Sequence, residues 1–217
     1  MVEDFTLETV KVGGAPLQAF RRRFQDVWEM FCRAVSAYGD REFLIEGPSR
    51  LTFQQTREKV DRMAAHLRER AGVGKGDHVG MLMENSSLFV VVFWAVQKLG
   101  ATAVVFNTRL APSELARQFG VSRMKGLLSS PLLSLKIQEI PPGSLEAPHM
   151  VMGPSWDAGL SGKAAELPSV ERDEDDVALI LFTSGTVGLP KGVMITHRNL
   201  ITSAIKQGYY LSRYEDL

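Results

Sequence analysis

The feature that most constrains this chain is the stretch of residues 177–200, where apolar runs flank a turn rich in glycine and hydroxyl groups. Residues 177–182 are continuously apolar and follow an acidic turn at residues 173–176, which predicts a buried strand. Residues 192–195 are apolar again and predict a short strand antiparallel to the first. We therefore expect a strand, a glycine-rich turn and a second strand.

The turn carries groups that suit a bound phosphate. Its two glycines permit positive φ or a close approach of the backbone to a ligand, and its hydroxyls can donate hydrogen bonds to anionic oxygens. Successive backbone N–H groups there can form an anion-binding nest. A lysine held between Pro190 and Gly192 adds a mobile positive charge. The candidate phosphate-binding residues are Thr183, Ser184, Gly185, Thr186, Gly188 and Lys191.

Two common nucleotide-binding motifs do not fit this turn. In the pattern G-x-x-x-x-G-K-[ST] counted from Gly185, the second glycine position holds Pro190, and Gly192 stands where Ser or Thr is required. The dinucleotide fingerprint fails as well, because Gly185 and Gly188 are not spaced G-x-G-x-x-G. The remaining alternative to a phosphate site is a hairpin that binds no ligand.

The N-terminal third predicts two helices with a hairpin between them. Apolar residues recur at helical spacing over residues 16–37, which predicts one long helix after an arm that ends at the glycines 13–14. Residues 42–46 and 50–52 flank a Gly-Pro-Ser turn and predict a hairpin. Thr52 and Gln55 then form a capping-box pattern, so a second helix should begin at Thr52. We expect it to bury one stripe and end at Gly72, with the stripe formed by Val60, Met63, Ala64 and Leu67.

The middle of the chain predicts a βαβ unit. Residues 78–83 and 101–106 read as strands, and residues 85–99 as a helix that is apolar nearly all round, hence buried. Such a unit has parallel strands and a right-handed crossover. A short helix over residues 112–119 and a strand over 125–129 should follow, whereas residues 131–172 read as loops with at most one short element. A last helix should start at Thr196 and run to about Leu211. The predicted fold class is α/β, with a mainly parallel sheet and helices on both faces.

Several other residues attract attention but do not form a site in the sequence. Cys32 cannot form an intramolecular disulfide, and we interpret it as a reduced core thiol without an activating partner. His149 has no evident partner, and His197 is expected to be structural. The arginines 21–23 are interpreted as a solvated helix face. No Cys/His cluster is spaced for zinc, so we expect no metal site.

The stretch 181–200 resembles the glycine-, serine- and threonine-rich signature of adenylate-forming enzymes. That superfamily contains the acyl-CoA synthetases, the adenylation domains of peptide synthetases and the luciferases. Val187 departs from the pattern, since many relatives have a further threonine there. The order and spacing of other segments also resemble acyl-CoA synthetases, so that the resemblance covers about residues 38–129 and 173–200; the segments include Val73-Gly74-Lys75-Gly76-Asp77, Lys98-Leu99-Gly100-Ala101 and Asn107-Thr108-Arg109-Leu110-Ala111-Pro112.

The resemblance implies a function and a set of cofactors. It implies that the turn wraps the β- and γ-phosphates of ATP while a carboxylate attacks the α-phosphorus, and that Mg²⁺ and CoA are also used. Thr183, Ser184, Gly185, Thr186 and Gly188 would cradle the phosphates, and Lys191 would neutralise charge. The resemblance also implies three further elements that this chain lacks: a glutamate that holds magnesium, an aspartate that binds ribose, and a small C-terminal domain with the adenylation lysine.

We therefore expect residues 1–217 to be the N-terminal portion of an AMP-binding large domain. The portion divides into a first α/β part at 1–130, a loop-rich segment at 131–172, and the phosphate-loop hairpin with its following helix at 173–217. The expected function is that of an ATP-dependent acid:CoA ligase in fatty acid metabolism, which needs a downstream chain. The alternative is a truncated, inactive phosphate-binding or interaction module.

Charge and hydropathy limit the partners and the cellular location that we expect. The chain holds 25 Lys and Arg against 25 Asp and Glu, so its formal net charge of +0 gives no electrostatic argument for nucleic acid. The longest apolar run, residues 88–96, is too short to span a bilayer, and the N-terminus shows no secretory signal. We expect a cytoplasmic protein whose partners are ATP and a carboxylic acid of unspecified identity.

Overall fold

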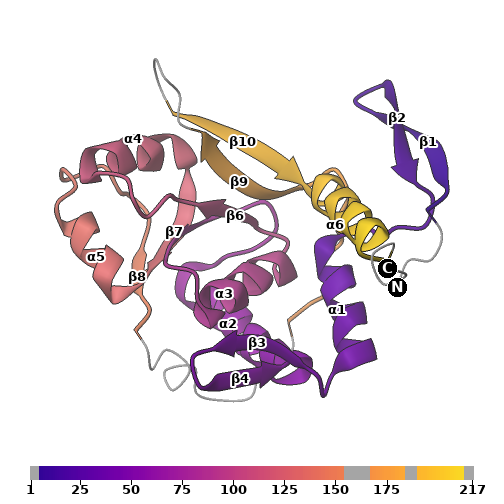
Figure 1. The fold of residues 1–217 in the computed structure, drawn as a ribbon. Coiled ribbons are helices and arrows are strands. Elements are labelled where there is room, and N and C mark those ends of the chain that lie inside the picture. The colour runs from indigo at the N-terminus through magenta and orange to yellow at the C-terminus, as the bar shows by residue number, and fades with distance from the viewer. Residues whose placement is uncertain (1–4, 154–166, 184–189, 213–217) are drawn as a thin grey trace.

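The structure, a computed structural model, describes residues 5–153, 167–183 and 190–212 and is built around one six-stranded sheet. The strand order is β10-β9-β6-β5-β7-β8 (Figure 1). All neighbours in this sheet are parallel except β9 and β10, which are antiparallel. The bounds are β5 His78–Leu82, β6 Thr102–Val105, β7 Met124–Ser129, β8 His149–Val151, β9 Val177–Thr183 and β10 Lys191–Thr196.

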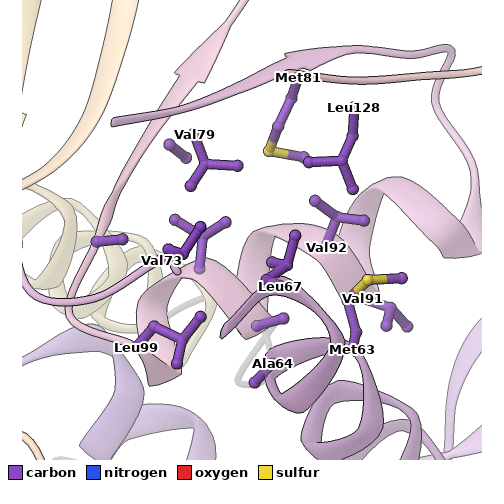
Figure 2. Close-up of a cluster of buried hydrophobic side chains, with 14 of the residues drawn as sticks. Met63, Ala64, Leu67, Val73, Val79, Met81, Val91, Val92, Leu99 and Leu128 are labelled. Carbon is purple, nitrogen blue, oxygen red and sulfur yellow. The ribbon is translucent and has the colours of Figure 1, made fainter. Parts of the chain in front are cut away.

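Helices cover both faces of the sheet, as the sequence predicted. Successive strand residues point to opposite faces, so that Val79 and Met81 join one buried cluster while Leu82 joins the other. The first cluster, seen in Figure 2, packs the sheet against α2 (Phe53–Ala71) and α3 (Ser87–Lys98). The second packs the opposite face against α4 (Pro112–Ser122) and α5 (Pro131–Gln138). The α/β fold class is therefore confirmed.

Local signals set the ends of the two central helices. The Thr52 hydroxyl accepts a hydrogen bond from Gln55 N at 3.1 Å, and the Gln55 side chain accepts one from Thr52 N at 2.9 Å, which is the predicted capping box. Gly72 ends α2 with φ of 63°, a left-handed conformation that costs glycine little. Ser86 caps α3 by accepting from Phe89 N at 3.2 Å. The four residues predicted as the α2 stripe are all fully buried.

The N-terminal prediction of one long helix over residues 16–37 was wrong. The chain there forms a hairpin, β1 (Leu7–Val12) and β2 (Ala15–Phe20), and only then the helix α1 (Val27–Tyr38). Gly13 and Gly14 both have positive φ, at 56° and 85°, which makes the tight turn that joins the strands. Asp26 starts the helix, since its side chain accepts from Glu29 N at 2.7 Å. The second hairpin, β3 (Glu42–Glu46) and β4 (Ser49–Thr52), forms where it was predicted.

Residues 131–172 contain one element more than the sequence predicted. Ser130 caps α5, with its hydroxyl accepting from Leu133 N at 3.3 Å, and β8 then adds a strand at the edge of the sheet. The final helix α6 (His197–Ser212) starts as expected after Thr196, whose hydroxyl accepts from Asn199 N at 3.3 Å. Within the described ranges, the longest apolar helices fall short of what crossing a membrane requires.

Candidate functional site

The predicted phosphate turn joins the two strands at one edge of the sheet. Thr183 ends β9 and Lys191 begins β10, and these two residues are direct partners across the antiparallel ladder. Ser184, Gly185, Thr186 and Gly188 fall between them and lie outside the described residues. Because β9 runs parallel to β6, Thr183 at its end lies at the same edge as the carboxyl ends of the parallel strands, with Lys191 as its partner. That side is where open α/β sheets bind ligands.

Both described flanks of the turn have groups that remain accessible. Thr183 and Lys191 are exposed, and the Thr183 hydroxyl makes only a long hydrogen bond, at 3.5 Å, to the carbonyl oxygen of Lys191. Among the described residues no carboxylate forms an ion pair with the Lys191 ammonium group. An exposed cation and a weakly engaged hydroxyl are therefore paired at the mouth of the turn. This arrangement fits an anionic ligand.

The body of the hairpin is held by packing on one face. Phe182 stacks on Phe106 of the segment after β6, with ring centroids 5.7 Å apart and planes 16° apart. Gly192 faces the same side, and a Cβ built on it would lie 2.9 Å from Cγ2 of Ile180. The opposite face carries the exposed side chains Leu181 and Val193, which are ladder partners. Phe182 and Ile180 of β9 are thus packed on one face, and the face of Leu181 and Val193 is open.

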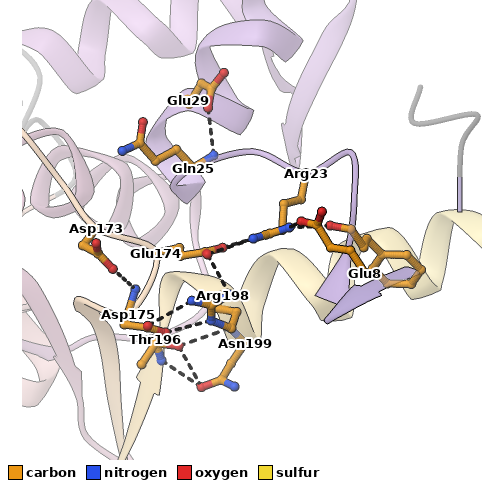
Figure 3. A network of polar contacts seen from close by, with 11 residues as sticks. Glu8, Arg23, Gln25, Glu29, Asp173, Glu174, Asp175, Thr196, Arg198 and Asn199 are labelled. Carbon is orange, nitrogen blue, oxygen red and sulfur yellow. Dashed lines mark hydrogen bonds and ion pairs between the residues drawn. The ribbon is translucent and has the colours of Figure 1, made fainter. Parts of the chain in front are cut away.

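A polar network fixes the end of the hairpin that lies away from the turn (Figure 3). Arg198 of α6 donates from Nε and Nη2 to the two carboxylate oxygens of Asp175, at 2.7 and 2.9 Å. Its Nη1 lies 2.7 Å from a Glu174 carboxylate oxygen. Two backbone bonds join the same segments, from His197 N to Asp176 O at 3.1 Å and from Arg198 N to Glu174 O at 2.7 Å. The turn before β9 and the helix after β10 are thereby tied together.

Arg23 extends this network to the N-terminal hairpin. Its Nε and Nη2 donate to Glu174 at 2.7 and 2.9 Å, and its Nη1 donates to Glu8 of β1 at 2.6 Å. The interpretation of arginines 21–23 as a solvated helix face was wrong, because these residues precede α1 and Arg23 is part-buried. The hydrogen bond from Arg23 holds the pKa of Glu174 below its ordinary value, and the bond from Arg198 does the same for the pKa of Asp175. These carboxylates are therefore ionised at neutral pH.

A third arginine joins the segment before β9 to the end of a neighbouring helix. Arg172, in the segment leading to β9, donates to the carbonyl oxygens of Gln97, Lys98 and Val170. The first two belong to the C-terminus of α3, whose carbonyls lack helical partners. Sequence reasoning missed Arg23, Arg172 and Arg198. A signal was present, since four consecutive acidic residues at 173–176 directly before a buried strand require cationic partners.

The structure shows the contacts of three residues that the sequence singled out. His197 is 2% exposed and its Nδ1 accepts from Val27 N at 3.4 Å, which agrees with the structural role predicted for it. His149 does have a partner, contrary to prediction, because its Nε2 lies 2.8 Å from the Ser129 hydroxyl. Cys32 also has one, since Arg57 donates to its sulfur at 3.1 Å; burial nevertheless raises the pKa of the thiol, which stays protonated.

Comparison with known proteins identifies the class. Residues 31–216 match the family described as AMP-binding enzyme, so the chain belongs to that family. Within the part of the chain that the structure describes, no group of three or more His, Cys, Asp or Glu side chains is placed to hold a metal ion.

The similar curated proteins are acid:CoA ligases. The long-chain-fatty-acid–CoA ligase FadD13 of Mycobacterium tuberculosis is 38% identical over 160 residues, a match that covers 71% of this chain and 31% of the ligase. The 4-coumarate–CoA ligase CCL1 of Humulus lupulus is 29% identical over 212 residues, covering 87% of this chain and 37% of the ligase. The chain therefore spans about a third of the length of the relatives it matches.

Solved structures agree on the fold. A fatty acyl CoA synthetase of Mycobacterium tuberculosis superposes with a TM-score of 0.70 at 32% identity, covering 80% of this chain and 35% of that one. VinN in complex with 3-methylaspartate gives a TM-score of 0.77 over 88% of this chain and 53% of its own, at 19% identity, and so speaks for the fold alone.

Proposed function

We propose that this chain forms the ATP-phosphate-binding part of an ATP-dependent acid:CoA ligase. Such an enzyme activates a carboxylic acid as an acyl-adenylate with release of pyrophosphate and then transfers the acyl group to the thiol of CoA. The observation that carries the proposal is the β9–β10 hairpin, which sets an exposed Lys191, without an ion pair among the described residues, beside Thr183 at the carboxyl edge of the sheet. Family membership and the ligase names of the relatives support it.

Each residue in this proposal has a defined physical role. The hydroxyls of Thr183, Ser184 and Thr186 donate to phosphate oxygens of ATP. Gly185 and Gly188 let the backbone N–H groups approach the phosphates. Lys191 offsets negative charge on the phosphates and on the pyrophosphate as it leaves. ATP itself supplies the activated phosphorus that the carboxylate attacks.

The proposal assigns Mg²⁺ and CoA to no described residue of this chain. Positioning a carboxylate, a metal ion and a nucleotide together requires groups from more than one segment, and the hairpin offers only the phosphate contacts. We therefore propose that residues 1–217 alone do not catalyse exchange of pyrophosphate into ATP. Full activity belongs to the complete product of the reading frame that contains this chain.

The test is acid-dependent exchange of labelled pyrophosphate into ATP, measured on that complete product and on residues 1–217. The acid panel takes its members from the named relatives: a long-chain fatty acid, 4-coumarate and 4-hydroxybenzoate. We expect exchange with at least one acid for the complete product and none for residues 1–217. Robust exchange by residues 1–217 would contradict the division of labour. ATP binding without exchange by either protein would favour the alternative, an inactive phosphate-binding module.

A further inference from the structure

The register of β10 is set by pairing on one side only. Within the described residues β10 pairs only with β9, so it is an edge strand with a single ladder. The ladder is also irregular at its base, because the pairing shifts between Ile195 and Thr196. A strand with one ladder that is irregular at its base has fewer contacts to specify its register than a central strand has. Contacts at its base therefore add to the selection of the observed pairing.

Register matters here because it decides where the lysine points. Side chains alternate between the two faces of a strand, so a slip of one residue moves every side chain of β10 to the other face. In the observed register Lys191 is the partner of Thr183, at the mouth of the turn. A slipped strand would carry the ammonium group to the face occupied by Phe182 and Ile180.

Arg198 fixes the strand at its base. It is the second residue of α6, which begins directly after β10, and its side chain is 7% exposed. The planar guanidinium group meets both carboxylate oxygens of Asp175, a fork geometry that tolerates little displacement. Asp175 lies two residues before the start of β9, so the fork joins the entry of one strand to the exit of the other. Glu174 cannot follow a shifted Arg198, since Arg23 holds it from the other side.

Gly192 makes the alternative registers costly. A Cβ at its position would lie 2.9 Å from Cγ2 of Ile180, closer than side-chain atoms pack, and Ile180 is itself 9% exposed within the second core cluster. A one-residue slip would put either Lys191 or Val193 in that place. The glycine thus opposes the slipped states while Arg198 favours the observed one.

We propose that Arg198 is a positioning residue for the phosphate site: with Gly192 it selects the β10 register that holds Lys191 beside Thr183. Arg198 acts from the opposite end of the strand and touches no ligand. The inference rests on the proposed function only in naming ATP phosphate as the group that Lys191 meets.

Register can be measured without any activity, by cross-linking. In a Cys32→Ser background, the pair Leu181→Cys and Val193→Cys joins ladder partners on the open face. The pair Leu181→Cys and Met194→Cys joins residues that are on opposite faces unless the strand slips. We expect the first pair to oxidise to a disulfide and the second to resist. Adding Arg198→Met should lower the yield of the first pair several-fold and raise that of the second.

The kinetic arm uses the complete product of the reading frame. Arg198→Met should raise the KM for ATP about tenfold and leave the KM for the acid unchanged. It should cause no further rise in a Lys191→Ala background, because it acts only through that lysine. Arg198→Lys keeps the charge but loses the two-oxygen contact with Asp175, so its KM for ATP should lie between those of the parent and of Arg198→Met. It replaces Arg198→Met in this test if that variant does not fold. The matched control is Arg33→Met, which breaks an exposed ion pair to Glu29 on α1 and should change nothing.

The outcomes separate this inference from the proposed function. Unchanged yields for both cysteine pairs in Arg198→Met and Arg198→Lys would overturn the register role. Additive effects of Arg198→Met and Lys191→Ala on the KM for ATP would also overturn it. Altered yields, together with a Lys191→Ala protein whose ATP affinity is normal, would uphold the register role and remove Lys191 from the proposed phosphate site.

Discussion

The strand β5 at the centre of the sheet and the strand β10 at its edge are built by different interactions. From Val79 to Leu82 every residue of β5 is buried, and it pairs with strands on both sides. The first four residues of β10 are exposed, and it pairs on one side only. The centre is held by apolar burial spread over many residues. The edge is held by one ladder, by packing of β9 on one face and by polar contacts at its base, and its exposed end lies beside the predicted phosphate turn.

We expect the centre of the sheet to determine the stability of the protein and its edge to determine ligand binding. Removing a methyl group from the centre should lower the free energy of unfolding with no direct effect on ligand binding. Removing a polar group from the edge should alter binding more than stability. The following changes test that division, from the largest expected effect to the smallest.

Leu67→Ala should produce the largest loss of stability. Leu67 is fully buried between α2 and the sheet, so its truncation leaves a cavity and should cost about 2–5 kcal/mol of unfolding free energy. The matched edge variant is Leu181→Ala, since Leu181 is 39% exposed and should cost less than about 1 kcal/mol. Urea unfolding followed by circular dichroism measures both. Equal losses would mean that the hairpin is as tightly packed as the centre.

Lys191→Ala should weaken ATP binding without lowering stability. A charge-assisted hydrogen bond contributes about 1.5–3 kcal/mol, so the affinity of the complete product for ATP should fall roughly ten- to hundredfold. The melting temperature should stay close to that of the parent, because Lys191 is exposed and has no ion pair among the described residues. Isothermal titration calorimetry and thermal melts give the two numbers. A large fall in melting temperature would give Lys191 a structural role.

Thr52→Ala should lower stability moderately and leave ATP binding unchanged. It removes the N-cap of α2 and one half of the capping box, at a cost of about 1 kcal/mol. Thr52→Ser keeps the hydroxyl and is the matched control. ATP affinity should be the same in both variants. A change in ATP affinity on losing this cap would show that the centre and the edge are coupled.

The same contrast explains which parts of the fold the sequence predicted. The ends of α2 and α3 depend on neighbours a few residues away, such as Gln55 for Thr52, and the pattern of buried residues along them follows helical spacing. Those elements were predicted correctly. The β1–β2 hairpin was missed although its signal was local, because Leu17 and Phe20 fit the helical spacing of the residues after them and Gly13 and Gly14 were interpreted as the end of an arm.

The residues that hold the candidate site in place could not be predicted from local sequence. Arg23 and Glu174 are 151 positions apart, and nothing in either segment specifies the other. Arg172 finds its carbonyl partners 74 and 75 positions away, at the end of a helix whose placement depends on the whole sheet. The sequence located the chemical groups of the turn, because glycines, hydroxyls and a lysine are visible as residue types. It could not locate the network that aligns the two strands bearing them.

The smallest effect we expect is a dependence of stability on pH that comes from His197. The pKa of His197 is below its ordinary value of 6.5, chiefly because the ring is buried; Asp26 and Asp176 raise it and Arg172 lowers it further. The folded protein therefore keeps the ring neutral, with Nδ1 accepting from Val27 N, while the unfolded chain takes up a proton near pH 6.5. The stabilising contribution is complete above that pH and declines as the pH falls toward the folded-state pKa.

His197→Gln should flatten that decline, since glutamine does not titrate. Urea unfolding at several pH values between about 7.5 and 5 measures the slope. The lowered pKa values of Glu174 and Asp175 add to the slope only toward the acid end of this range, and they do so in the parent and the variant alike. His66→Gln, on the partly exposed side of α2, is the comparison from the centre of the molecule. The two variants should differ, with the larger flattening at His197, because its ring is 2% exposed and its protonation breaks a hydrogen bond as well as charging a buried group. A slope unchanged by His197→Gln would mean that the junction of β10 and α6 opens readily enough to hydrate the ring. An open junction there would also remove the rigid base on which the register of β10 depends.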